Sequence, residues 1–123
     1  MHIDPAADRA MVSAVARRTA RGPAAHLIAA LLEMGQNKGE LLRHEERAWA
    51  SVTFSGARHT VALSFAGTEA IAAGEELIEA LPDHEFAIPR QLVADAAVIG
   101  VEHTADHDPR LVVELELLLL DEG

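Results

Sequence analysis

Residues 48–65 carry two runs of alternating apolar and polar side chains around a short central segment, and this feature constrains the fold most. Alternation with a period of two is typical of a strand with one buried face. The central segment spans residues 55–58. Its Gly56 occupies the first central position, where a type II′ hairpin turn requires glycine. We therefore predict an antiparallel hairpin in which Phe54 faces His59.

Two longer apolar runs follow in the C-terminal half, over residues 92–102 and 110–120. The polar loop 103–109 joins them, so we predict a second antiparallel hairpin. A register with Glu102 opposite Arg110 gathers most of the branched side chains on one face. The register matters, because a shift of one residue moves a side chain to the other face of the sheet.

Helix-forming stretches flank the first hairpin. Residues 5–21 are strong helix formers, and residues 23–34 place leucine and isoleucine on one stripe after Pro23, which suits a first helical turn. Residues 68–81 follow the hairpin, with Thr68 at the capping position. These patterns predict two N-terminal helices and one helix between the hairpins.

A short apolar stretch at residues 86–88 predicts a further strand before Pro89. The expected fold is therefore α+β, with an antiparallel sheet of about five strands, one helix between the two hairpins and two N-terminal helices (α-α-β-β-α-β-β-β). The 123 residues fit one domain, in which residues 1–35 form a helical segment and residues 40–123 form the sheet with its helix.

Composition and charge exclude several classes of protein. The chain has no cysteine, which rules out a disulfide scaffold and thiolate sites. Its net charge is -10 without a basic stripe, so we expect no nucleic-acid partner. The longest apolar run, 117–120, is too short to cross a membrane, and the opening residues carry no targeting signal. We therefore expect a cytoplasmic protein, and without nucleotide-binding or metal motifs we expect no cofactor.

Three residues are candidates for catalysis. The predicted second hairpin places Asp95 on the apolar face, opposite Leu117, and burial raises the pKa of a carboxylic acid toward the range that suits proton transfer. Asp95 would be the acid or base, with His59 or Arg58 binding an anionic group. The alternative is structural: Asp95 accepts hydrogen bonds from the backbone or from Arg90, and His59 is a partly buried residue of its hairpin.

The loop of the second hairpin holds the densest group of nitrogen and oxygen ligands. Its two histidines are four residues apart, as in helical metal sites, but a turn does not place them on one face. Aspartate and histidine are also common loop residues. We therefore predict no metal site and retain as candidates for inspection His103, Asp106, His107 and Asp108.

Both faces of the predicted sheet are apolar near the C-terminus, because Leu118 and Leu120 lie on the face opposite the core. Such a sheet needs cover on both sides. On the first hairpin, Trp49 and Thr53 point to the less apolar face, and tryptophan is typical of subunit contacts. These four residues form the predicted ligand or partner surface. The alternative is that Trp49 rests under an N-terminal helix.

The order of elements is similar in outline to that of hot-dog thioesterases and roadblock-type dimers. Residues 67–69, at the start of the central helix, do not match the catalytic segment of hot-dog enzymes. A central helix that ends at Leu81 is also short for a roadblock-type dimer. We therefore assign the chain to neither family, and fold analogy alone would not establish a function.

The sequence favours a non-enzymatic binding or assembly module, and we expect a homodimer. A small apolar or anionic molecule is the other class of ligand that the predicted surfaces suit. The alternative is a small acid-base enzyme, hot-dog-like in outline, that uses Asp95 with His59 or Arg58. The two hypotheses differ in whether Asp95 opens into a pocket.

Overall fold

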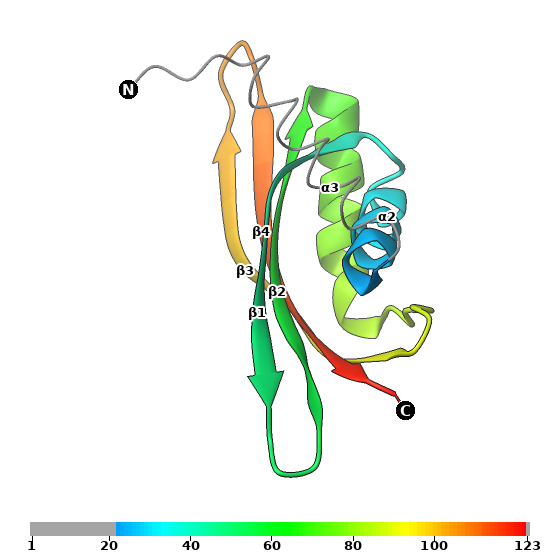
Figure 1. Cartoon of the computed structure of the whole chain (residues 1–123). Coiled ribbons are helices and arrows are strands. Elements are labelled where there is room, and N and C mark those ends of the chain that lie inside the picture. Colours follow the sequence, from blue (N-terminus) through cyan, green and yellow to red (C-terminus); the bar gives the residue numbers. More distant parts are fainter. Residues whose placement is uncertain (1–21, 123) are drawn as a thin grey trace.

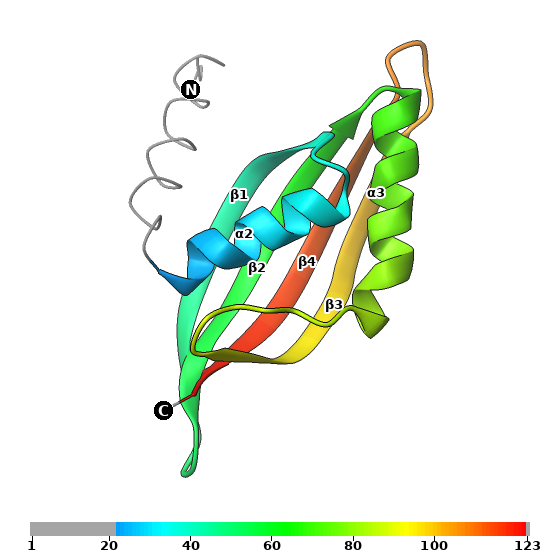
Figure 2. The same cartoon turned by 90° about the vertical axis from the view of Figure 1, so that its right-hand side faces the viewer.

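Two helices lie on one face of a four-stranded sheet (Figures 1 and 2). The computed structural model describes residues 22–122. No helix in this part of the chain is long and apolar enough to cross a membrane. The elements, in chain order, are α2 (Pro23–Met34), β1 (Gly39–Ala50), β2 (Ser55–Ala66), α3 (Thr68–Ala80), the short 3-10 helix η1 (Leu81–Asp83), β3 (Gln91–Thr104) and β4 (Arg110–Asp121).

The strand order is β1-β2-β4-β3, and all three pairings are antiparallel. The two hairpins therefore meet through their second strands, β2 and β4, which form the centre of the sheet. Directly paired residues share a face. The face under α2 and α3 carries the core, whose fully buried members on the central strands are Val61, Leu63, Phe65, Val113, Leu115, Leu117 and Leu119. We call the opposite face the open face.

Phe65 fixes the distance between the helices and the sheet. Its ring is fully buried, and a methyl group built on Gly74 of α3 would lie 2.7 Å from the Cδ2 atom of this ring. Methyl groups built on Gly35, at the end of α2, and on Gly39, at the start of β1, would lie 2.8 and 2.7 Å from the Cε1 atom of the same ring. Three glycines thus leave the space that one aromatic side chain fills.

The register of the first hairpin differs from the predicted one. Ala50 pairs with Ser55, so the turn spans residues 51–54 and His59 faces Glu46 instead of Phe54. Gly56 lies inside β2, where an added methyl group would overlap the carbonyl oxygen of Leu119 on β4. The glycine therefore serves the close approach of two strands instead of a tight turn, and this is why the turn prediction was wrong.

The register of the second hairpin is right at one end and wrong at the other. Val93 pairs with Leu119 as expected, but two β-bulges, between Val93 and Asp95 and between Val98 and Gly100, shift the remaining residues. Each bulge inserts one extra residue into β3. The insertions keep valine and alanine facing the core and turn Asp95 to the open face.

The predicted strand count and element order are wrong, although the α+β class and the antiparallel sheet agree with the structure. The described residues form four strands and two α-helices. Residues 84–88 cross from η1 to β3 without joining the sheet; Ile88 is buried in the core there, and Phe86 packs against it. Apolar side chains at 86–88 therefore reflect burial of a connection. The predicted helix at 5–21 lies outside the described residues.

The close packing of the Phe65 ring against Gly74 predicts the effect of one substitution. Gly74→Ala gains helix propensity of about 1 kcal/mol but forces a methyl group against two buried side chains, so we expect net destabilisation of about 1–2 kcal/mol. Urea unfolding measures this change. Gly100→Ala is the control, because its added methyl group meets only ordinary contacts with Glu114, at 3.4 Å or more. Equal stability of Gly74→Ala and the parent chain would contradict the close packing of Gly74 against the Phe65 ring.

Candidate functional site

The sheet buries one ionisable side chain among the aliphatic residues of the core. His59 on β2 is 1% exposed and follows the same face as Val61. Burying an imidazole ring costs free energy unless its polar atoms find partners. The neighbouring strand β1 supplies both partners.

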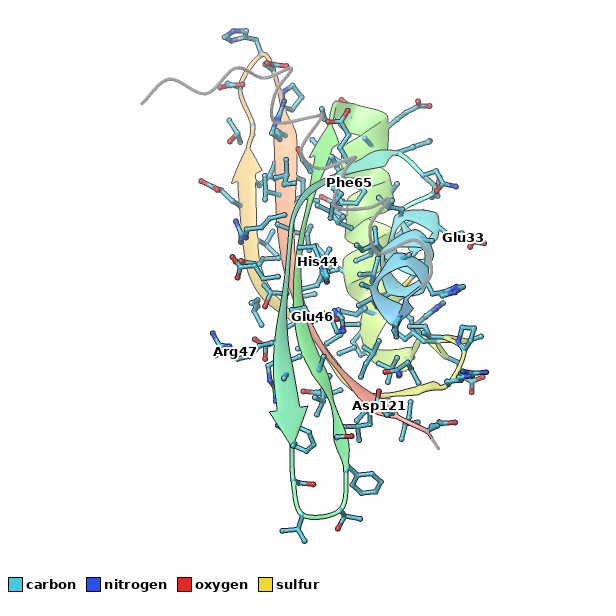
Figure 3. All side chains as sticks on the ribbon, viewed as in Figure 1. Glu33, His44, Glu46, Arg47, Phe65 and Asp121 are labelled. Atoms are coloured by element: carbon cyan, nitrogen blue, oxygen red, sulfur yellow. The ribbon has the colours of Figure 1, made fainter. Side chains whose placement is uncertain are left out.

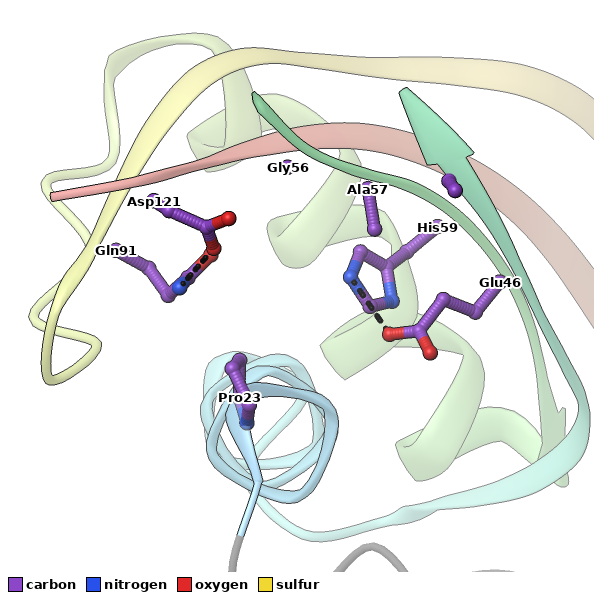
Figure 4. Close-up of a pocket in the computed structure, with 8 residues that line it drawn as sticks. Pro23, Glu46, Gly56, Ala57, His59, Gln91 and Asp121 are labelled. Carbon is purple, nitrogen blue, oxygen red and sulfur yellow. Dashed lines mark hydrogen bonds and ion pairs between the residues drawn. The ribbon is translucent and has the colours of Figure 1, made fainter. Parts of the chain in front are cut away.

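His44 and Glu46 reach His59 from β1. Glu46 pairs directly with His59, and His44 lies two residues earlier on the same face. The Nε2 atom of His44 is 2.9 Å from Nδ1 of His59, and Oε1 of Glu46 is 3.4 Å from Nε2 of His59. Figure 3 labels His44 and Glu46 on β1, and Figure 4 shows the contact of His59 with Glu46. We call these three residues the histidine cluster.

The carboxylate determines how the protons of the histidine cluster are arranged. A carboxylate only accepts hydrogen bonds, so its nearness favours a proton on Nε2 of His59. In a neutral ring Nδ1 of His59 is then an acceptor, and Nε2–H of His44 donates to it. Among the described residues every buried side-chain nitrogen and oxygen has a partner, so this arrangement leaves none unsatisfied.

The two imidazoles are held in their neutral form. Burial lowers the pKa of His59 below its ordinary value near 6.5; the carboxylate of Glu46 opposes this shift, and His44 adds to it. Burial likewise lowers the pKa of His44, again against the influence of Glu46. The site therefore combines two imidazole rings, whose pKa values burial lowers, with the side chain of Glu46.

A pocket of about 280 Å³ opens beside the histidine cluster. Figure 4 shows His59 and Glu46 along one side, Gln91 and Asp121 along the other, and Pro23 of α2 between them. Gln91 Nε2 donates to Asp121 Oδ1 at 2.9 Å. The walls thus offer proton acceptors, and among residues 22–122 no serine, threonine or lysine side chain lines this pocket. The arrangement can hold and transfer a proton.

The three predicted catalytic residues do not come together. His59 faces the core, whereas Arg58 and Asp95 lie on the open face, each beside Leu118 of β4. The backbones carrying Arg58 and Asp95 are two strand spacings apart, roughly 9–10 Å. Arg58 is bound to Glu116 at 2.8 Å, and Asp95 is exposed. Asp95 is therefore not the buried carboxylate that its predicted role as an acid or base assumed.

The predicted metal candidates lie at the exposed end of the second hairpin, His103 within β3 and the other three in the loop that follows it. All four of them, His103, Asp106, His107 and Asp108, are exposed. Asp106 Oδ1 accepts a hydrogen bond from the backbone N–H of Asp108 at 2.9 Å, which is a local turn contact. Within residues 22–122 no group of three or more such side chains is placed to hold a metal ion.

Three of the four predicted partner residues gather at one end of the open face. Trp49, Gly56, Leu120 and Leu92 follow one another across the four strands. Leu118 lies on the same face of β4, two residues before Leu120. Thr53 is exposed in the loop between β1 and β2. Leu118 and Leu120 are only 9% and 8% exposed, so the single chain already covers most of their surface.

Charged pairs cross the middle of the open face. Arg43 of β1 binds Glu114 of β4, reaching across β2, and Arg58 of β2 binds Glu116 of β4. Arg47 lies directly opposite Arg58, and no salt bridge to Arg47 is found within the described residues. This pair therefore sets two like charges directly opposite each other on neighbouring strands.

Sequence reasoning missed two members of the histidine cluster, His44 and Glu46. The first hairpin was predicted to begin at residue 48, so both residues fell outside it. His44 and Glu46 share the parity of Ala48, so a first strand extended back to residue 43 would have placed them on one face. A register paired through Ala50 and Ser55 places both beside His59.

The comparisons with known proteins give one fold likeness. No protein family matches the sequence, and no curated protein matches it. Among solved structures, a chain described as "Virion of native gene transfer agent (GTA) particle" is similar, with a TM-score of 0.56 and 14% sequence identity. The match covers 75% of this chain and 85% of that chain. At this identity the likeness concerns the fold.

The neutral histidine cluster predicts a pH dependence of stability. The pKa of His59 is lower in the folded chain than in the unfolded chain, so below about pH 6.5 the unfolded state binds more protons. We therefore expect the free energy of unfolding to fall as the pH is lowered from about 7.5 to about 5.5. Thermal unfolding across this range measures the slope.

Two variants test whether the histidine cluster causes this dependence of the free energy of unfolding on pH. His59→Phe removes one buried titrating ring and should flatten the dependence, leaving the smaller part due to His44. His26→Gln on α2 is the matched control, because the ring of His26 is exposed in the folded chain. An unchanged slope in His59→Phe would show that the acid sensitivity arises elsewhere.

Proposed function

We propose that this chain is a non-enzymatic assembly module, a structural subunit that associates with copies of itself. The observation that carries the proposal is the placement of exposed apolar side chains. In the described part of the chain, every exposed large apolar residue lies on an edge strand or in the loop between β1 and β2: Leu42, Val52, Phe54, Leu92, Ile99 and Val101. Neither the helices nor the central strands carry one.

The sheet supports self-association through its two edges. Within residues 22–122, no strand pairs with the outer side of β1 or of β3. Both edges are long, with 12 residues in β1 and 14 in β3. An unpaired strand presents backbone N–H and C=O groups that readily accept another strand. Apolar side chains along the same edges would be buried by such an addition.

The fold likeness agrees with this proposal. The similar solved chain comes from a virion particle, which is an assembly of protein chains. A small α+β domain of this shape is therefore compatible with a role in a large assembly. Fold alone does not establish function, so the proposal depends on the edges and their apolar side chains.

The enzyme alternative receives less support from the geometry. The three predicted catalytic residues lie on two faces of the sheet, and Asp95 does not line the pocket beside His59. A working acid or base needs a partner within hydrogen-bond reach of the reacting atoms. The histidine cluster satisfies its own polar atoms and explains His59 as a structural residue.

Sedimentation velocity of the full chain tests the proposal. Over concentrations from about 1 to about 500 µM we expect the weight-average sedimentation coefficient to rise with concentration, as for a small, partly apolar interface. Multi-angle light scattering gives the mass of the associated species. A monomeric mass over the whole range would refute self-association.

A further inference from the structure

We infer that two copies of this chain pair along their β1 strands, antiparallel, with Glu46 of each copy at the two-fold axis. The inference rests on the proposed self-association and names the edge and the register that carry it. The second copy extends the sheet through β1, so that the open faces of both copies lie on one side.

The outer edge of β1 is the more regular of the two edges. Beyond the irregularity between Leu41 and Arg43, residues 43–50 pair with β2 without interruption. In β3 the ladder is interrupted twice, between Val93 and Asp95 and again after Val98. Bulges bend a strand and disrupt its hydrogen-bonding edge, which protects it against further pairing. A regular ladder therefore forms more readily on β1.

An unbalanced charge on β1 indicates what the partner supplies. Arg47 lies opposite Arg58, and like charges that face each other across two strands are destabilising. Arg58 is compensated by Glu116 at 2.8 Å, whereas no salt bridge to Arg47 is found among the described residues. Figure 3 shows Arg47 pointing away from the helices and from the sheet. A carboxylate on an added strand would balance it.

Symmetry restricts the registers of such a pair. A two-fold axis perpendicular to the sheet makes one residue of β1 face its own copy. The residue that follows it on one strand then faces the residue that precedes it on the other strand, and the side chains of each facing pair lie on the same side of the sheet. With Glu46 on the axis, Glu45 faces Arg47 of the partner subunit, and by symmetry Arg47 faces the partner subunit's Glu45. Arg43 faces Trp49 of the partner subunit, which suits a cation–π contact.

The neighbouring registers lack this complementarity. An axis at Glu45 sets Arg43 against Arg47 of the partner subunit, and an axis at Arg47 sets that arginine against its own copy, so in neither register does Arg47 face a carboxylate. An axis at His44 sets Arg47 opposite the irregular segment at residues 41–42, where no carboxylate balances it. The Glu46 register does bring two carboxylates together on the core side, where each lies 3.4 Å from Nε2 of His59 in its own chain.

Charge reversal tests the register. Glu45→Arg and Arg47→Glu each replace two attractive pairs by two repulsive ones, so each variant should self-associate about tenfold more weakly. The double variant restores opposite charges and should regain the parent association. The two single variants, mixed together, should form a heterodimer, since both of its facing pairs are then opposite in charge. Sedimentation velocity reports all four results.

Two controls separate the interface from effects within one chain. Asp95→Arg reverses a charge on the same open face but on β3, and it should leave the association unchanged. Arg47→Glu places a carboxylate opposite Arg58, so the monomer should become slightly more stable to heat while the dimer becomes weaker. A loss of association in Asp95→Arg, or none in the two β1 variants, would overturn the register.

Cross-linking locates the two-fold axis directly. Because the chain has no cysteine, Glu46→Cys introduces a single thiol. Facing residues of an antiparallel pair have Cα atoms about 4.5–5.5 Å apart, within reach of a disulfide. In Ala48→Cys, the control on the same face, the two thiols would be four residues out of register, roughly 14 Å apart. We expect oxidised dimer from Glu46→Cys and much less from Ala48→Cys.

The outcomes separate the two proposals. If the parent chain associates but Glu46→Cys forms no more dimer than Ala48→Cys, the β1 register is wrong and the assembly function stands. If the parent chain is monomeric at every concentration, the assembly function fails, and the register fails with it. Rescue of association by the double charge reversal, together with selective cross-linking at residue 46, establishes the register.

Discussion

The pairing of β2 with β4 is the interaction on which the rest of the structure depends. It joins two hairpins that are each marginal on their own, and it creates the continuous aliphatic face that α2 and α3 cover. Gly56 permits the close approach of these strands at one end, and Phe65 fills the space under three glycines near the other. Both edge strands, and every surface feature on them, are positioned by this central pair.

The histidine cluster shows how a polar side chain is accommodated in that core. His59 lies on the central strand, so its ring cannot turn to water, and the edge strand β1 has to supply its partners. His44 and Glu46 do so, while burial lowers the pKa of the His59 ring. The same strand therefore carries polar support for the core on one face and an unbalanced arginine on the other.

Much of the fold could be predicted from local patterns, and the failures have physical causes. The helix starts near Pro23 and Thr68 and the alternation in β2 and β4 depend on near neighbours, so they were visible in the sequence. The predicted capping role of Thr68 was wrong, because Gly67 is the N-cap of α3 and no side chain caps this helix. The registers depend on contacts between strands that are distant in the chain. A glycine such as Gly56 fits a tight turn and a close approach of two strands equally well, so the sequence does not distinguish them. The alternation of apolar and polar residues does not reveal the bulges of β3. The misplacement of Asp95 and the omission of His44 both follow from those registers.

The bulges of β3 have a consequence for the size of any assembly built on strand addition. A sheet with two regular edges can add copies at both ends and grow into a fibre without limit. Here two bulges disrupt the hydrogen-bonding edge of β3, while the proposed symmetric pairing of β1 would use up its own binding surface. The asymmetry between the edges would thus make the pair a closed end point and keep this acidic chain from polymerising.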